Sequence, residues 1–254
     1  MRSQSLFALV TGASTGIGRA VATEFGKLGY TTILVARNSQ GLEETKQFVT
    51  QVGGSATIYS CDLSQTDQVI SLATKITADF NHLDTIINIA GIWHGQNQVY
   101  ADTDFEKFTS QVILDTINVG LTAPTLLIHQ LLPIMPPHSH IVNLSGTFES
   151  GAKGWLPYYV SKRAIEDLTA GLAEELGDKP IYVNCVSPSD TATPQYQKYF
   201  PEDAADANSP QDIAKLIADI TTKQETGKFY VIKKTPHHPI ISSVTITKPR
   251  FISP

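Results

Sequence analysis

The chain has 254 residues, 41% of them hydrophobic, and a formal net charge of −5 at pH 7. This length is enough for one generous hydrophobic core, so we expect a single domain, and the acidic balance argues against a nucleic-acid partner. The first apolar run ends at Thr11-Gly12, far short of a membrane span and without a cleavage site of small residues, so we expect a cytoplasmic protein with no membrane partner.

Predicted strands and helices alternate along the chain. The first are a strand at residues 5–10 and a helix at 19–28, whose apolar side chains share one face. Then follow a strand at 31–36, a helix from Ser39 to about 52, a strand at 55–60, a helix capped by Ser64, a strand at 85–89, a long helix near 105–135 that bends before Pro124, a strand at 140–144, a helix near 157–176, a strand at 181–186, an irregular stretch to 209, a helix at 210–221 and a strand at 228–232. Strands separated by helices of this length need crossover connections, which predicts an α/β fold with a doubly wound parallel sheet.

The two cysteines, Cys61 and Cys185, lie at or inside apolar runs and lack the spacing of a metal or redox site. We expect both to be buried free thiols, as in proteins of a reducing compartment. The sequence therefore predicts no metal site.

A glycine-rich turn joins the first strand to the first helix. Gly12 permits a tight turn, Gly16 lets the backbone approach a bulky anion, and Gly18 lets the helix pack closely on the strand. The N-terminus of the following helix offers unpaired N–H groups to a phosphate. The spacing G-x-x-x-G-x-G in this context predicts a pyrophosphate cradle for a dinucleotide; the alternative is an ordinary turn with helix-packing glycines.

The end of the second strand indicates which dinucleotide binds. An acid at this position would take the ribose 2′-hydroxyl and select NAD, but here the strand ends at Ala36 and Arg37 follows. A guanidinium suits a 2′-phosphate, so we predict NADP(H); the alternative is that Arg37 is only a solvated surface residue. Asp62, after the third strand, is a candidate acceptor for the adenine amino group, or an ordinary turn residue.

Tyr158 and Lys162 stand four residues apart at the start of a predicted helix, so their side chains share one face. Hydride delivery to a carbonyl creates an alkoxide that needs a proton, and a phenol is a weak acid unless a nearby ammonium lowers its pKa. A second match, Tyr230 and Lys234, lies at the end of a strand, where the two side chains would be about 13 Å apart. We therefore predict Tyr158 as the general acid or base; a half-buried tyrosine beside a solvated lysine is the alternative.

A serine after the strand at 140–144 is the candidate for polarising the substrate carbonyl. Ser145 lies at the carboxyl edge of the predicted sheet, where ligands of open α/β sheets bind. Thr147 and Ser150 are nearby alternatives, and a serine in an ordinary turn is another.

Taken together, these residues resemble the short-chain dehydrogenase/reductase family, over positions 5 to about 232. Residues 11–18, including Ser14 and Ile17, resemble the family's TGxxxGIG loop, and residues 88–91, from Asn88 to Gly91, resemble its NNAG segment. Asn118 resembles the catalytic asparagine, Ser145 the serine and residues 158–162 the YxxSK motif. Residues 184–188, ending at Pro188, with Thr193 following, resemble the stretch that meets the nicotinamide carboxamide.

The resemblance implies a Rossmann-like sheet of seven strands, in the single-domain branch of about 250 residues, and a role for each matching residue. Tyr158 would be the general acid or base, and Lys162 would bind the nicotinamide ribose and lower the tyrosine pKa. Ser145 would orient the substrate, and Asn118 would hold a water in a proton relay. The long helices near 109–135 and 157–176 resemble the family's dimer bundle, so we expect a homodimer or homotetramer.

The sequence departs from the family pattern at several positions. Ile89 replaces the second asparagine of NNAG, and Ser189 stands where the family has glycine. Aligning forward from Asn143 puts Gly146 at the serine position, whereas counting back from Tyr158 supports Ser145, which we adopt. The family's glycine-rich VDGG ending is absent.

Residues 233–254 form an unusual extension, which we expect to pack on the catalytic domain of residues 1–232 or on a partner subunit. From Lys228 to the end there are five basic residues and no acidic one, and residues 240–247 have strand-like character between prolines. The stretch has three candidate pairings: a sheet edge, a partner subunit or an extended ligand. A phosphate-bearing substrate carrier bound by Lys233, Lys234 and Arg250 is one hypothesis; a packed or solvated extension is the alternative.

These features favour an NADP(H)-dependent oxidoreductase that interconverts a ketone and a secondary alcohol, both small molecules. One alternative is a non-catalytic dinucleotide sensor or structural protein, and another is an epimerase, which the absence of a separate substrate domain disfavours. Two segments, 92–104 and 189–208, are expected to shape the substrate site, and their aromatic residues favour an apolar or ring-bearing ligand: Trp93, His94, Tyr196, Tyr199 and Phe200.

Overall fold

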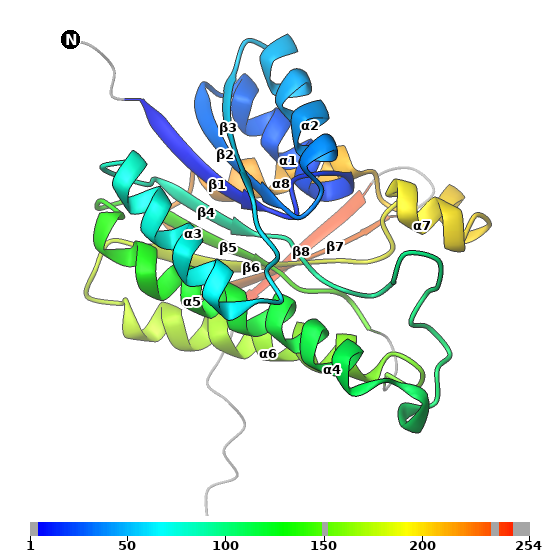
Figure 1. Ribbon diagram of the computed structural model, residues 1–254. Coiled ribbons are helices and arrows are strands. Elements are labelled where there is room, and N and C mark those ends of the chain that lie inside the picture. Colours follow the sequence, from blue (N-terminus) through cyan, green and yellow to red (C-terminus); the bar gives the residue numbers. More distant parts are fainter. Residues whose placement is uncertain (1–4, 149–151, 235–238, 246–254) are drawn as a thin grey trace, which may run out of the picture.

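The computed structural model describes residues 5–148, 152–234 and 239–245. In this part of the chain the strands form one sheet in the order β3-β2-β1-β4-β5-β6-β7-β8 (Figure 1). The strands are β1 (Leu6–Thr11), β2 (Tyr30–Ala36), β3 (Ser55–Ser60), β4 (Thr85–Asn88), β5 (His140–Leu144), β6 (Tyr182–Pro188), β7 (Lys228–Lys234) and β8 (Pro239–Thr245). Strands β1 to β7 are the seven predicted strands and run parallel, whereas β8 runs antiparallel to β7.

Helices cover both faces of this sheet. The α-helices are α1 (Gly16–Lys27), α2 (Ser39–Gln51), α3 (Thr66–Asp79), α4 (Ser110–Ile117), α5 (Ala123–Leu131), α6 (Leu156–Glu175), α7 (Pro194–Tyr199) and α8 (Pro210–Ile220). Helices α1, α2 and α8 lie on one face, and α3, α5 and α6 lie on the other (Figure 1). The predicted doubly wound α/β fold of a single domain is therefore confirmed.

The strand residues alternate between the two faces, as the pleat of a strand requires. In β1, Val10 packs into the hydrophobic core beneath α1 and α8, whereas Leu9 packs into the core on the opposite face. Both side chains are fully buried, which explains why β1 reads as an unbroken apolar run. Cys61 and Cys185 are buried free thiols, as predicted.

The long helix predicted near 105–135 is interrupted, as expected, just before Pro124. A π-helical turn, η2 (Asn118–Thr122), separates α4 from α5, and a short 3₁₀ turn, η1 (Phe105–Lys107), precedes α4. The run Ser110–Ile134 is long and apolar enough to span a membrane by length and composition alone. Leu127 and Leu131 are fully buried in the core against α3, so we interpret this run as a core helix of the fold.

Several local predictions need correction. Asn38, not Ser39, caps α2, because its side chain accepts a hydrogen bond from the Gly41 amide. The residue preceding α3 is Gln65, whereas the predicted cap Ser64 donates to Asp62. The stretch predicted as irregular to residue 209 contains α7 and the 3₁₀ turn η4 (Asp203–Asp206).

The extension forms the added strand at the sheet edge. All seven residues of β8 pair with β7, from Pro239 opposite Lys234 to Thr245 opposite Lys228. Of the alternatives left open by the sequence, the structure shows the pairing with a sheet edge of the same chain. Arg250, which the sequence analysis names as a candidate phosphate contact, lies outside the described residues.

The glycines of the first turn are needed for different reasons. Gly12 and Gly16 have positive φ angles of 70° and 55°, which L side chains rarely adopt. A Cβ at Gly18 would lie 2.2 Å from the carbonyl oxygen of Gly12. The turn therefore cannot keep this shape with a larger residue at position 18.

A Gly18→Ala substitution is therefore expected to lower the free energy of unfolding by about 3 kcal/mol, because the backbone of a packed turn must move. Urea denaturation measures this change. Gly171→Ala is the matched control: its Cβ would meet nothing within 4 Å, so the helix α6 should gain about 0.5–1 kcal/mol. Equal stabilities of the two variants would contradict the predicted close approach.

Candidate active site

Two adjoining cavities open where the parallel strands end. The larger, of about 700 Å³, is lined by residues that follow β1, β2, β3 and β4, and the smaller, of about 410 Å³, by residues that follow β5 and β6. Ile17, Trp93, Leu144, Tyr158 and Thr193 line both. The carboxyl edge of the sheet is therefore the candidate site, as the position of the glycine turn predicted.

The larger cavity begins at the glycine turn. Most of the predicted cofactor residues line it: Gly12, Ser14, Gly16, Ile17, Gly18, Arg37, Asp62, Gly91, Tyr158, Lys162 and Thr193. The Thr11 hydroxyl accepts hydrogen bonds from the amides of Ile89 and Ala90, which ties the turn to the segment after β4. A Cβ at Gly16 would lie 2.9 Å from Cγ2 of Thr193, so the segment after β6 closes over the turn. These residues form an elongated cradle that fits a dinucleotide.

Two arginines line this cavity, and they differ in their partners among the residues that the structure describes. Arg19 donates to the carbonyl oxygen of Ser14 at 2.6 Å and pairs with Glu44 at 2.8 Å. The side chain of Arg37 is exposed and has no ion-pair partner among the residues that the structure describes. Arg37 thus places a positive charge, unpaired within the described part of the chain, at the end of β2, where the sequence predicts a 2′-phosphate.

The side chains of two predicted cofactor residues, Asp62 and Asn88, form hydrogen bonds within the protein. Oδ1 of Asp62 accepts hydrogen bonds from the amide and hydroxyl of Ser64, so its carboxylate shapes the turn after β3 as well as lining the cavity. The side chain of Asn88 does not line either cavity. It is buried and donates to Oδ1 of Asn143 at 2.9 Å, which joins β4 to β5 beneath the site. The part of Asn88 in cofactor binding stays a prediction.

Tyr158 and Lys162 lie where the two cavities meet. They occupy successive turns near the start of α6, and Nζ of Lys162 lies 5.6 Å from the ring centroid of Tyr158. The same Nζ donates to the carbonyl oxygen of Leu144 at 2.7 Å, which holds the lysine against the end of β5. A Cβ at Gly91 would lie 3.3 Å from this Nζ, so glycine leaves room for the lysine side chain.

Burial is the largest influence on the pKa values of Tyr158 and Lys162. It raises the pKa of the Tyr158 phenol well above its ordinary value, opposite to the lowering expected from the lysine alone. It also lowers the pKa of Lys162 to about 8, although the carboxylate of Glu166 opposes this shift. At neutral pH, Tyr158 is therefore a protonated donor and Lys162 is predominantly a cation.

Ser145 lines the smaller cavity, and its hydroxyl is also engaged with groups of α6. This residue is 2% exposed, and its hydroxyl donates to the carboxylate of Glu166 and to the carbonyl oxygen of Lys162. Glu166 in turn pairs with the half-exposed Arg163, so the hydroxyl joins the end of β5 to α6. Position 146 faces Tyr158: a Cβ at Gly146 would lie 3.9 Å from the Tyr158 oxygen. The role of Ser145 in orienting the substrate therefore stays a prediction.

Asn118 begins the π-helical turn and does not line either cavity. Its amide donates to the carbonyl oxygen of Ser64 at 3.0 Å, and its Oδ1 accepts from the Thr122 hydroxyl. The side chain therefore fixes the kink between α4 and α5 to the segment after β3. Its part in a proton relay stays a prediction.

The segment after β6 forms the far wall of the smaller cavity. Pro188 and Ser189 line it, and the Ser189 amide donates to the carbonyl oxygen of Ile232, which continues the pairing with β7. The Ser189 hydroxyl accepts from Asn208 at 2.9 Å. Thr193 caps α7 through the Tyr196 amide. Serine at position 189 is therefore accommodated by contacts with Asn208.

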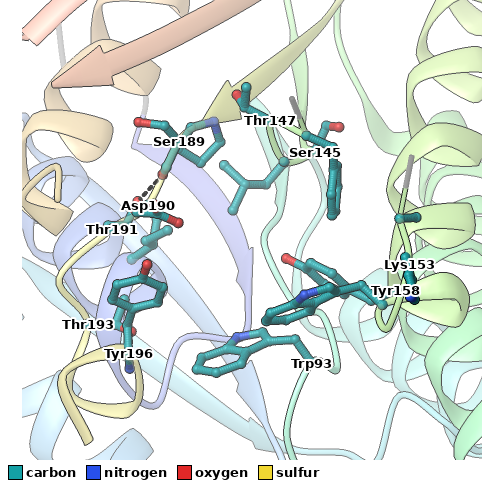
Figure 2. A pocket seen from close by; sticks show the side chains of 17 residues that line it. Trp93, Ser145, Thr147, Lys153, Tyr158, Ser189, Asp190, Thr191, Thr193 and Tyr196 are labelled. Atoms are coloured by element: carbon teal, nitrogen blue, oxygen red, sulfur yellow. Dashed lines mark hydrogen bonds between the residues drawn. The ribbon is translucent and has the colours of Figure 1, made fainter. Parts of the chain in front are cut away.

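Aromatic side chains surround the mouth of the smaller cavity. Figure 2 shows Trp93 and Tyr158 on one side and Tyr196 across from them. The sequence singled out Trp93 and Tyr196, but it missed Phe148 and Trp155, whose rings lie 5.9 and 6.3 Å from that of Tyr158. Both come from the connection between β5 and α6, which carried no local signal. The cavity suits a ligand with an apolar ring.

Comparison with known proteins agrees with this arrangement. Residues 6–204 match the short chain dehydrogenase family. The chain belongs to this family. It is 32% identical to a 3beta-hydroxysteroid dehydrogenase of Mediterraneibacter gnavus over 190 residues, which cover 73% of this chain and 66% of the relative.

Solved short-chain dehydrogenases share the fold. A metagenomic short-chain oxidoreductase in complex with NADP is 29% identical, with a TM-score of 0.72 over 86% of this chain and 90% of that one. A short chain dehydrogenase from Shigella flexneri complexed with NADP is 26% identical, with a TM-score of 0.76 over 89% and 96% of the two chains. The chain is therefore an oxidoreductase of the short-chain dehydrogenase family with a Rossmann-like fold.

Proposed function

We propose that the protein is an NADP(H)-dependent oxidoreductase that interconverts a ketone and a secondary alcohol. The observation that carries this proposal is the position of Tyr158 and Lys162 where the dinucleotide cradle meets the smaller, aromatic cavity. The Arg37 guanidinium, which has no ion-pair partner in the part of the chain that the structure describes, and the NADP complexes of similar short-chain dehydrogenases support the choice of cofactor.

The residues of the cradle divide the work of holding the cofactor. The amides of the glycine turn at the start of α1 would hold the pyrophosphate, Arg37 the 2′-phosphate, and Lys162 the nicotinamide ribose. Pro188 and Thr193 would contact the nicotinamide on the side of the smaller cavity. Bound there, the nicotinamide supplies a hydride to the carbonyl carbon.

Tyr158 would complete the reduction by giving its proton to the substrate oxygen. An alkoxide is far more basic than a phenolate, so the transfer is downhill even though burial raises the Tyr158 pKa. The positive charge of Lys162 would stabilise the phenolate that remains. Alcohol oxidation would use the same groups in reverse.

The rate of ketone reduction is expected to fall as pH rises through about 8. The pKa of Lys162 is lowered to about 8, so its stabilising ammonium is present below this pH and is lost above it. Tyr158 does not account for this fall, because its pKa is raised. The measurement is kcat/KM for reduction between pH 6 and 10; a constant value would contradict the role of the lysine charge.

A dinucleotide sensor that lacks catalysis is the second candidate. It predicts tight NADPH binding without turnover of any carbonyl compound. Tyr158 and Lys162 disfavour it, because both are in place with a cavity beside them. NADPH oxidation with a panel of ketones, quinones and acyl thioesters separates the two functions.

We also propose a homodimer or homotetramer. Exposed apolar side chains on α4 and α6 support this assembly: Leu114 is 56% exposed and Val160 is 44% exposed, and the two helices pack side by side. Within each chain, residues 1–232 would form the catalytic domain and 233–254 its extension. The pairing of β8 with β7 supports an extension that packs on the domain.

A further inference from the structure

Residues 190–207 form a flap that borders both cavities. Thr193 lines both of them, Pro194 lines the larger one and Tyr196 lines the smaller one. Figure 2 shows Thr193 and Tyr196 across the pocket from Tyr158. The position of the flap therefore affects the space for the cofactor and for the substrate alike.

The outer part of the flap packs on aromatic residues from other segments. The ring of Trp93 lies 6.3 Å from the ring of Tyr196 and 6.3 Å from that of Phe200. Phe200 also lies 6.1 Å from the ring of Trp155. These contacts join side chains, so they depend on where the base of the flap is held.

The two ends of the flap meet at Asn208, which is fully buried. The Asn208 amide donates to the Asp190 carbonyl oxygen at 2.8 Å, and the Asn208 carbonyl oxygen accepts from the Ala192 amide at 2.9 Å. The side-chain Nδ2 donates to the hydroxyl oxygen of Ser189 at 2.9 Å and contacts the carbonyl oxygens of Asp190 at 3.1 Å and Ile232 at 3.4 Å. One buried residue thus joins both ends of the flap to β7.

Ser189 connects this anchor to the end of β6. It follows Pro188, the last residue of that strand, and its amide donates to the same Ile232 carbonyl oxygen at 2.9 Å. Its own carbonyl oxygen accepts from the Thr191 hydroxyl at 3.0 Å. Serine stands here where the family pattern has glycine, and glycine has no hydroxyl to accept the hydrogen bond from Asn208.

We propose that Ser189 and Asn208 are positioning residues, whose hydrogen bond holds the flap against the cofactor cradle and the substrate cavity. They act through the flap residues that line the two cavities. The inference goes beyond the proposed function, because it concerns how the site is held closed and not which compound is reduced.

The physical basis is local opening of the chain. A surface segment opens at a lower free-energy cost than the core, so the loss of one anchoring hydrogen bond raises the open fraction of the flap and leaves the central strands unchanged. A cofactor that binds the closed form then binds more weakly, in proportion to the closed fraction that is lost.

Hydrogen exchange of the full-length protein without cofactor, followed by mass spectrometry, tests the inference. In Ser189→Ala the flap amides should exchange about 10-fold faster, as expected for the loss of one buried hydrogen bond, while β1 and β5 should exchange as in the wild type. Ser189→Thr keeps the hydroxyl and should restore slow exchange. The double variant with Asn208→Ala should exchange no faster than Asn208→Ala alone, because Ser189 acts through the Asn208 side chain.

NADPH affinity, measured by fluorescence titration, links the flap to the site. The NADPH Kd of Asn208→Ala should rise by the factor that the exchange data give for the lost closed fraction. Ser139→Ala is the matched control. The Ser139 hydroxyl is also buried and donates to the Pro136 carbonyl oxygen at 2.6 Å, but this residue precedes β5, at the opposite edge of the sheet, and lines neither cavity. It should lower global stability without changing flap exchange or the NADPH Kd.

Unchanged flap exchange in Ser189→Ala would overturn the inference, and so would equally fast exchange in Ser189→Ala and Ser189→Thr. A flap that is mostly open in Asn208→Ala with an unchanged NADPH Kd would also overturn it. If Asn208→Ala does not fold, the comparison of the two Ser189 variants decides. None of these measurements uses a carbonyl substrate, so a failure to turn over any ketone would overturn the proposed function and leave this inference standing.

Discussion

Replacing Tyr158 with phenylalanine is expected to lower kcat/KM for ketone reduction by about 1000-fold, within the range of a positioned general acid. The ring would still fill its place between Phe148 and Trp155, so packing is kept and only the proton donor is lost. The measurement is NADPH oxidation with a ring-bearing ketone. NADPH affinity should stay within a few-fold of the wild type, since the loss concerns the chemical step.

Tyr159→Phe provides the matched control. It removes one phenol hydroxyl from the neighbouring residue of α6, which packs against Phe148 but does not line either cavity. Its activity should match the wild type within a few-fold. If Tyr158→Phe also kept activity within a few-fold, Tyr158 would not be the proton donor and the mechanism would be wrong.

Reversing the charge at Arg37 is expected to weaken NADPH binding by about 100-fold in Kd. Loss of a charge-assisted hydrogen bond costs about 1.5–3 kcal/mol, and an aspartate adds repulsion of the 2′-phosphate. Because Arg37 has no ion-pair partner among the described residues, Arg37→Asp leaves no other charge unpaired. The affinity for NADH, which lacks this phosphate, should be unchanged or tighter.

Lys179→Asp controls for the change in net charge. Lys179 is exposed just beyond the end of α6, and it lines neither cavity. Its Kd values for NADPH and NADH should match those of the wild type. Equal losses of NADPH affinity in the two variants would show that Arg37 acts only through the net charge of the protein and makes no direct contact with the 2′-phosphate.

The parts of the site built from residues close in the sequence could be predicted. The glycine turn leads directly into α1, and Tyr158 and Lys162 lie in the same helix, α6. The sequence spacing of these residues is therefore enough to define their relative positions. The position of Arg37 follows equally from the end of one strand. Local spacing in a strand, turn or helix is fixed by backbone geometry, which makes these features readable from the sequence.

Features that depend on long connections could not be predicted. Counting back from Tyr158 to Ser145 crosses the connection between β5 and α6, whose length is not set by local geometry, so spacing alone does not decide between Ser145 and Gly146. Gly146, which the count forward from Asn143 reaches, lies two residues beyond the end of β5 and faces the Tyr158 oxygen. Phe148 and Trp155 were missed because nothing in their sequence shows that the connection folds over the site.

The pairing of β8 is a further example. Its strand character was visible at residues 240–247, but the sequence left its partner open. The choice depends on β7 being an edge strand with unpaired backbone groups, which is a property of the whole sheet. Similarly, Asn88 was placed after the correct strand, but its contact with Asn143 depends on β4 lying beside β5.

The most direct test of the proposed function follows the hydride itself. Wild-type protein is incubated with a ring-bearing ketone and NADPH that carries deuterium at both positions of nicotinamide C4, and the alcohol is analysed by mass spectrometry. The mechanism predicts one deuterium on the carbinol carbon of each product molecule, and a rate about 1000-fold lower with Tyr158→Phe. Tight NADPH binding without any labelled alcohol from the whole ketone panel would contradict it.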